Sequence, residues 1–73
     1  MELFHTLADQ ASARIRLRVV EKHLEGRIEF RNIGFDSHRK AFEALHGTAV
    51  PALWDGARLH EGEAACEAVL AAL

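Results

Sequence analysis

Hydrophobic and polar residues alternate along this chain with two periods, and each period predicts a different kind of element. Alternation with a period of two is typical of strands and marks residues 27–33, which Gly34 ends. Leu3 and Phe4 lie in a short segment, residues 2–6, that we also interpret as a strand. Between Asp36 or Ser37 as a cap and Gly47 as a left-handed terminal residue, helical spacing predicts a helix. Its apolar face carries Ala41, Phe42 and Leu45.

The segment 11–24 fits both periods. Residues 14–20 alternate as a strand does, and a β-hairpin over residues 14–33 is the alternative. A helix is favoured because Asp9 is a good N-cap, Gly26 follows the end, and apolar residues recur at helical spacing. They form one stripe of Ala13, Leu17, Val20 and Leu24, and a second row of Ile15 and Val19.

The last third of the chain predicts a hairpin followed by a helix. Residues 50–54 are a strand whose proline, Pro51, restricts it to an edge, a start or a special bond. Asp55-Gly56 is a two-residue turn, and residues 57–60 return as the partner strand. From Glu61 onward an alanine-rich helix is expected, with Cys66, Val69, Leu70 and Leu73 on its apolar face.

The predicted order is β-α-β-α-β-β-α, an α/β fold with a four-stranded mixed sheet flanked by three helices. The first two strands are joined through a helix and should be parallel, whereas the last two should be antiparallel. A length of 73 residues predicts a single domain, residues 1–73, and 49% hydrophobic residues suffice for a core.

Composition excludes several classes of protein. Cys66 is the only cysteine, so no disulfide framework exists and a reducing compartment is expected. A net charge of −2 gives no basic footprint for nucleic acid. The apolar runs are too short for a membrane span, and no signal peptide precedes them. We therefore predict a cytoplasmic protein with no nucleic-acid or membrane partner.

The run Thr48-Ala49-Val50-Pro51-Ala52-Leu53-Trp54-Asp55-Gly56 resembles a segment of two related families. Glutaredoxins and the N-terminal domain of glutathione S-transferases, both of the thioredoxin-fold superfamily, carry such a segment before a hairpin. The order of elements resembles theirs over nearly the whole chain. The resemblance implies a thioredoxin-like, glutaredoxin-type fold and a cis bond between Val50 and Pro51.

The resemblance also places a redox site at the start of the first helix, where these families carry two cysteines or another catalytic side chain. Aligned on the preceding strand, Ala8 and Ala11 stand at the cysteine positions. Disulfide exchange needs a thiolate, so a dithiol–disulfide oxidoreductase is excluded at this site. Asp9 would compete for the same helix amides that lower the pKa of a thiol.

The ligand side of the resemblance is partly retained. It implies that the main chain of Val50 pairs with an extended ligand, and that Glu61 and Gly62 stand where the γ-glutamyl end of glutathione is received. Amides at a helix N-terminus favour that carboxylate, while Glu61 would repel it. The candidate surface therefore combines residues 7–11, the Val50-Pro51 loop and Glu61-Gly62. Glutathione is the only cofactor that this surface suggests.

Other residues suggest more specific functions, and each also has a structural interpretation. Thr6 or Ser12 could supply a hydroxyl to a glutathione-binding, transferase-like enzyme, but a structural role is favoured. The three arginines of residues 14–18 could bind an anion or lie solvated. Cys66 could be reactive or a small core residue. The histidines lack the short spacing of metal ligands, so no metal site is predicted. They are His5, His23, His38, His46 and His60.

Trp54 ends a strand at the hairpin and is a candidate for an interface. A small domain gains stability from a partner, so a homodimer is a reasonable expectation. Our leading hypothesis is a non-redox, glutaredoxin-like binding or interaction module without catalytic residues.

Overall fold

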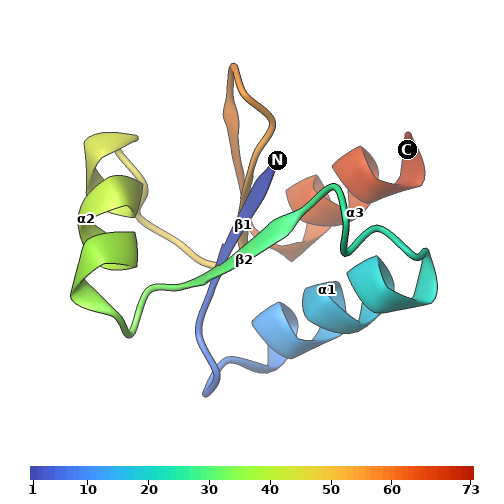
Figure 1. Ribbon diagram of the computed structural model, residues 1–73, viewed down its shortest axis with the longest axis horizontal. Coiled ribbons are helices and arrows are strands. Elements are labelled where there is room, and N and C mark those ends of the chain that lie inside the picture. Colours follow the sequence, from blue (N-terminus) through green and yellow to red (C-terminus); the bar gives the residue numbers. More distant parts are fainter.

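A four-stranded mixed sheet with strand order β2-β1-β3-β4 forms the centre of the fold (Figure 1). The computed structural model describes residues 1–73, and its strands are β1 (Glu2–His5), β2 (Glu29–Asn32), β3 (Ala52–Trp54) and β4 (Leu59–Glu61). Strands β1 and β2 are parallel, and β3 is antiparallel to both β1 and β4. The predicted α/β class, with a mixed sheet of four strands and three helices, is confirmed.

The three helices cover both faces of this sheet. They are α1 (Gln10–Glu21), α2 (Asp36–Ala44) and α3 (Glu63–Ala71). Helices α1 and α3 lie together on one face, and α2 lies alone on the other (Figure 1). No helix has the length and apolarity that crossing a bilayer requires.

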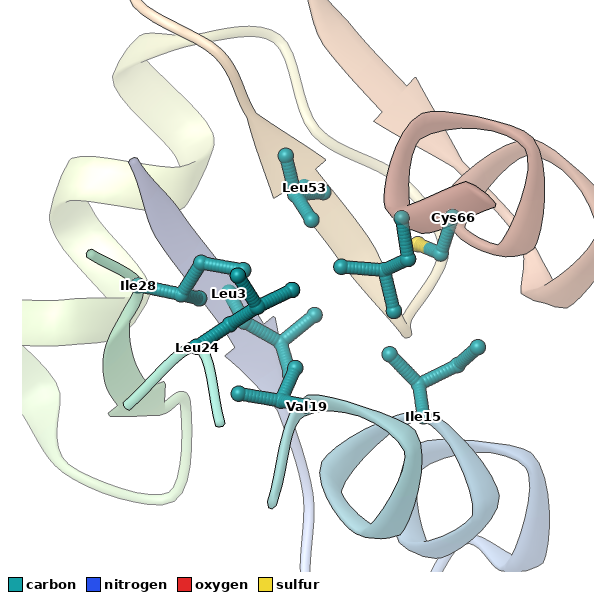
Figure 2. Close-up of a cluster of buried hydrophobic side chains, with 8 residues drawn as sticks. Leu3, Ile15, Val19, Leu24, Ile28, Leu53 and Cys66 are labelled. Atoms are coloured by element: carbon teal, nitrogen blue, oxygen red, sulfur yellow. The ribbon is translucent and has the colours of Figure 1, made fainter. Parts of the chain in front are cut away.

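The larger core lies between the sheet and the pair α1 and α3 (Figure 2). Its buried members are Leu3, Ile15, Val19, Leu24, Ile28, Leu53, Cys66 and Leu70. A smaller cluster of Phe4, Phe42 and Ala52 lies under α2. Side chains alternate along β1, so Leu3 enters one cluster and Phe4 the other. Burying each of these two side chains contributes about 1.5–3 kcal/mol, so β1 stabilises the packing on both faces of the sheet.

The choice of a helix over a hairpin for the second segment is confirmed, and of its two predicted apolar rows Ile15, Val19 and Leu24 are buried. The prediction is wrong for Leu17 and Val20. Helix α1 buries Ser12, Ile15 and Val19, whereas Leu17 and Val20 are 57% and 47% exposed. In this orientation one flank of the helix pairs with α3, and the buried Ser12 hydroxyl is hydrogen-bonded at the helix start. That bond makes burial of Ser12 inexpensive.

The ends of the first two helices differ from prediction. Left-handed backbone occurs at His23 (φ 56°) and His46 (φ 61°), not at Gly47. At the start of α2, Phe35 is the N-cap and makes no side-chain cap bond, while Asp36 is the first helical residue. Its carboxylate still favours the positive end of the helix dipole. Neither predicted role, a cap at Asp36 or Ser37 or a left-handed Gly47, is therefore correct.

The hairpin turn is shifted by one residue from the predicted Asp55-Gly56. Trp54 pairs with Leu59, so Gly56 and Ala57 are the central residues, and Gly56 has φ 100°. Asp55 Oδ1 accepts hydrogen bonds from the N–H groups of Ala57 and Arg58, each at 2.7 Å. Asp55 therefore precedes the two central residues of the turn, and its side chain stabilises the turn by accepting these two hydrogen bonds.

Two boundaries move with this shift. Glu61 ends β4 instead of opening the last helix, and α3 begins at Glu63. Strand β3 is central in the sheet, and Pro51 precedes it. Of the three placements predicted for this proline, the structure shows the start of a strand and a cis bond, and not an edge.

Candidate functional site

Three segments leave the sheet at the same end. Strand β1 finishes at His5, β3 begins at Ala52 opposite Phe4, and β4 finishes at Glu61 opposite Ala52. Three connecting segments therefore lie at this same end of the strands: the turn of residues 6–9, the loop of residues 48–51 and the junction of residues 61–63. We call these three segments the loop end of the sheet. The predicted site residues all lie at the loop end: Thr6, Asp9, Val50, Pro51, Glu61 and Gly62.

Glu61 holds the loop that precedes β3. Its Oε1 accepts hydrogen bonds from Thr48 N at 2.6 Å, from Ala49 N at 2.9 Å and from Thr48 Oγ1 at 3.2 Å. These bonds to the charged form, those of the two main-chain N–H groups first, lower the pKa of Glu61 below the usual value for Glu. The Glu61 carboxylate, which sequence analysis placed beside an incoming ligand, thus accepts its hydrogen bonds from the protein itself.

We expect protonation of Glu61 to release this loop. Its pKa is lower when folded than when unfolded, so the stabilisation is complete above the ordinary Glu pKa and is lost as pH falls through the lowered value. In an NMR pH titration, the amide signals of Thr48 and Ala49 should move together with a midpoint below 4.5.

The Glu61→Gln variant is the control for this titration, because it keeps an acceptor oxygen but has no charge to lose. The movement should disappear in that variant. Amide signals that move identically in both proteins would contradict the assignment of the loop contact to Glu61.

The main chain around Val50 is held on both sides but is itself free. Gly62 N donates to Pro51 O at 2.8 Å, which ties the far side of the loop to the β4–α3 junction. Neither the N–H nor the C=O of Val50 has a hydrogen-bond partner in the chain. The Val50–Pro51 peptide bond is cis, and the half-buried Val50 side chain contacts the smaller cluster. The loop thus presents one unpaired donor and one unpaired acceptor on a fixed segment.

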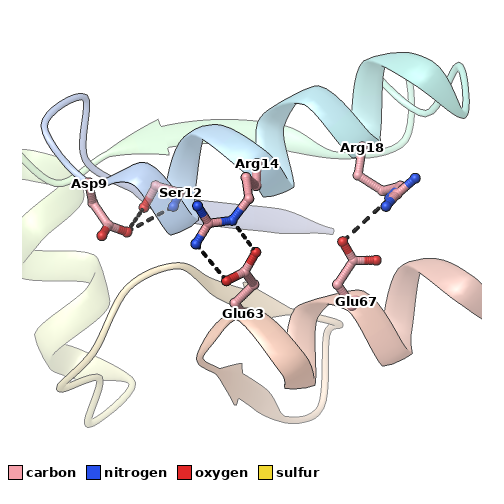
Figure 3. A network of polar contacts seen from close by, with 6 residues as sticks. All are labelled: Asp9, Ser12, Arg14, Arg18, Glu63 and Glu67. Carbon is pink, nitrogen blue, oxygen red and sulfur yellow. Dashed lines mark hydrogen bonds and ion pairs between the residues drawn. The ribbon is translucent and has the colours of Figure 1, made fainter.

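At the start of α1, Asp9 and Ser12 are hydrogen-bonded to each other. The predicted cap is confirmed, because Asp9 Oδ2 accepts from Ser12 N at 2.8 Å and from Ser12 Oγ at 2.7 Å (Figure 3). These two bonds lower the pKa of Asp9. The Ser12 hydroxyl is fully buried, donates to Asp9 and accepts from Thr6 N at 3.4 Å, so it is unavailable for catalysis. Ala8 and Ala11 carry no reactive group.

The arginines of α1 make contacts inside the protein. Arg14 binds Glu63 through two bonds of 2.6 and 2.9 Å, and Arg18 reaches Glu67 at 3.4 Å (Figure 3). This flank of α1 is thereby joined to α3, and these two guanidinium groups do not form an open anion site.

Arg16 makes a contact that sequence analysis missed. It donates to Thr6 O at 2.9 Å, and its Nη1 lies 2.9 Å from Nδ1 of the buried His5. Burial, then the charges of Arg16 and His38, lower the pKa of His5 and keep its ring neutral. Nδ1 therefore accepts from Arg16. No local signal predicts this pair, because it depends on how α1 lies over β1.

The remaining candidates lie away from the loop end. Cys66 is fully buried, and burial raises the pKa of its thiol to about 11, so the structural interpretation of this residue holds. His60 Nε2 lies 2.7 Å from Asp55 Oδ2 across the hairpin. Trp54 is half-buried against the smaller cluster. No three His, Cys, Asp or Glu side chains are grouped closely enough to hold a metal ion.

Comparison of the chain with protein-family models, with curated proteins and with solved structures finds no match.

Proposed function

We propose that this chain is a glutaredoxin-like, thioredoxin-fold binding module that captures an extended main-chain segment and performs no redox chemistry. The observation that carries the proposal is the free N–H and C=O of Val50 on a loop anchored by Glu61 and Gly62. An extended peptide can exchange two hydrogen bonds with such a residue, in the manner of strand addition. Because the loop is already ordered, little conformational entropy is lost on binding.

Two further features support the likeness to glutaredoxins. The element order β-α-β-α-β-β-α, with a four-stranded mixed sheet flanked by three helices, agrees with the order that the resemblance implies. The Val50-Pro51 segment directly precedes β3 and lies at the sheet end from which α1 departs.

The charges at this end define the class of ligand. Asp9 occupies the α1 amides with its own carboxylate. Glu63 is paired with Arg14, whose hydrogen bonds lower the pKa of Glu63, while the nearby charge of Asp9 opposes this shift. Glu61 adds a third carboxylate at the same edge. A ligand with several carboxylates is repelled here, so we infer that a neutral or cationic peptide binds better than glutathione.

Amide-resolved NMR titration tests this function. The probes are reduced glutathione and a tripeptide of matched length with both ends blocked, and the protein is the full chain. We expect saturable shifts at Ala49, Val50 and Gly62, larger for the blocked peptide at equal concentration. Val50→Pro, which removes the free donor, should abolish the shifts of Ala49 and Gly62, while Val50→Ala, which keeps the donor, should not. Amide signals of β1 report whether each variant is folded.

The outcomes separate the alternatives. Stronger shifts with glutathione than with the blocked peptide would favour a glutathione-binding, transferase-like protein. Shifts that are absent, or that leave Val50 unmoved, would overturn the proposed function.

A further inference from the structure

The outer edge of β2 carries main-chain groups that face away from the sheet. Glu29 N donates to Met1 O and Ile33 N donates to His5 O, each at 2.9 Å, so the odd-numbered residues of this segment turn towards β1. Main-chain groups alternate in direction along a strand. Phe30 and Asn32 therefore turn their N–H groups outward at an edge where no other strand lies.

Apolar side chains border the same edge. Phe30 is 37% exposed, and its ring meets the His5 ring edge-on with a centroid separation of 5.6 Å. His5 in turn contacts Arg16 of α1. Val20 follows Arg16 by one helical turn on the same flank and is 47% exposed. The edge thus combines unpaired main-chain groups with exposed apolar surface, a combination that promotes pairing with another strand.

We propose that two copies of this chain associate through β2, antiparallel about a two-fold axis, and form one continuous eight-stranded sheet. In an antiparallel pair, outward-facing residues must meet outward-facing residues. The two-fold axis between the two β2 strands must therefore lie at a residue that pairs with the same residue of the other copy. Within the centre of β2 this leaves registers centred on Glu29, Phe30 or Arg31.

Charge selects one of these registers. Centring on Glu29 or on Arg31 sets like charges directly opposite each other, which is destabilising. Centring on Phe30 sets each Glu29 opposite the partner's Arg31 and brings the two Phe30 residues together. The β2 sequence Glu-Phe-Arg is thus complementary to its own antiparallel copy, as a two-fold interface requires.

The hydrogen bonds agree with this register. The two Phe30 residues exchange both main-chain bonds, and Asn32 N–H reaches the C=O of the partner's Ile28. Asn32 O already accepts from Phe35 N at 3.1 Å, so the ladder ends there. Glu29 is 65% exposed and pairs with Arg31 of its own chain at 2.8 Å. Arg31 is 28% exposed and also pairs with Glu2 of its own chain, so the contact across the axis would extend an existing group of charges.

This dimer is independent of the ligand proposed above. The loop of residues 48–51 leads into β3, and β1 separates β3 from β2. Loss of one property therefore leaves the other measurable.

Sedimentation equilibrium of the full chain over a range of concentrations tests the interface. The wild type should approach twice the monomer mass of 8.1 kDa. Glu29→Arg alone, or Arg31→Glu alone, places like charges opposite at both symmetric positions and should raise the dimer dissociation constant about tenfold or more. An equimolar mixture of the two variants restores opposite charges at every pair, so it should form a heterodimer with a lower dissociation constant than either variant shows alone.

Two further variants guard against loss of fold. Phe30→Pro removes an outward N–H together with the Phe30 ring that meets its copy across the axis. Edge strands tolerate proline at such a place, so the variant should be a folded monomer by circular dichroism. Glu43→Arg makes the same charge change on the exposed part of α2 and should leave the dimer intact. A wild type that stays at 8.1 kDa, a dimer that survives Phe30→Pro, or a mixture without heterodimer would overturn the proposal.

Discussion

Gly47→Ala is expected to destabilise the domain by about 2–3 kcal/mol, the upper part of the range for overpacking a core. A Cβ at this position would lie 2.3 Å from Cε1 of Phe42 and 2.5 Å from both Cδ1 and Cζ. The Phe42 ring cannot retreat easily, because it is buried against the fully buried ring of Phe4 at a centroid distance of 5.2 Å. A domain of this size is stable by only about 5 kcal/mol, so the loss is a large fraction of the total.

Gly26→Ala is the matched control for this prediction. A Cβ at Gly26 meets nothing within 4 Å, and the residue does not have a positive φ. Alanine at such a site is expected to be neutral or to stabilise by about 0.4–1 kcal/mol. Urea unfolding of both variants, followed by far-UV circular dichroism, gives the two free energies. Equal unfolding midpoints for Gly47→Ala and the wild type would show that the Phe42 cluster is not tightly packed.

Gly47 shows that rules based on local sequence do not explain every glycine. The rule that glycine ends a helix in the left-handed conformation is about backbone freedom. Here His46 takes that conformation, and Gly47 is required because the Phe42 ring passes over it. The need arises from packing of α2 on the sheet, and no local pattern around Gly47 contains it.

The same division holds for α1. Its existence could be predicted from the Asp9 cap, the helical spacing and Gly26, which are all local features. Its orientation could not, because two apolar rows compete on the helix. The contacts of Arg14 with Glu63 and of Arg18 with Glu67, 49 residues apart, accompany the choice of the Ile15 row.

At the loop end of the sheet, sequence analysis placed the residues at one edge but not their contacts. The Asp9 cap is local and was predicted. The bonds from Thr48 and Ala49 to Glu61 depend on the register that sets Glu61 opposite Ala52. A hairpin turn shifted by a single residue was enough to move Glu61 from the expected helix into β4.

Native Cys66 is expected to react with a soluble disulfide reagent at least about 100-fold more slowly than an ordinary exposed thiol. The thiol is fully buried in the larger cluster, and its Sγ donates to His60 O at 3.5 Å. Its pKa of about 11, compared with 9.0 for a free thiol, reduces the reactive thiolate at pH 8 by about two powers of ten. Burial slows the reaction further, since the reagent reaches the sulfur only when the domain opens.

The Ala64→Cys variant provides an internal standard, because position 64 is exposed on the same helix. Release of the reagent's chromophore should be biphasic, with a fast phase from the introduced thiol and a slow phase from Cys66. Urea should accelerate only the slow phase, in parallel with unfolding. A native Cys66 that reacts as fast as the exposed thiol would contradict its burial.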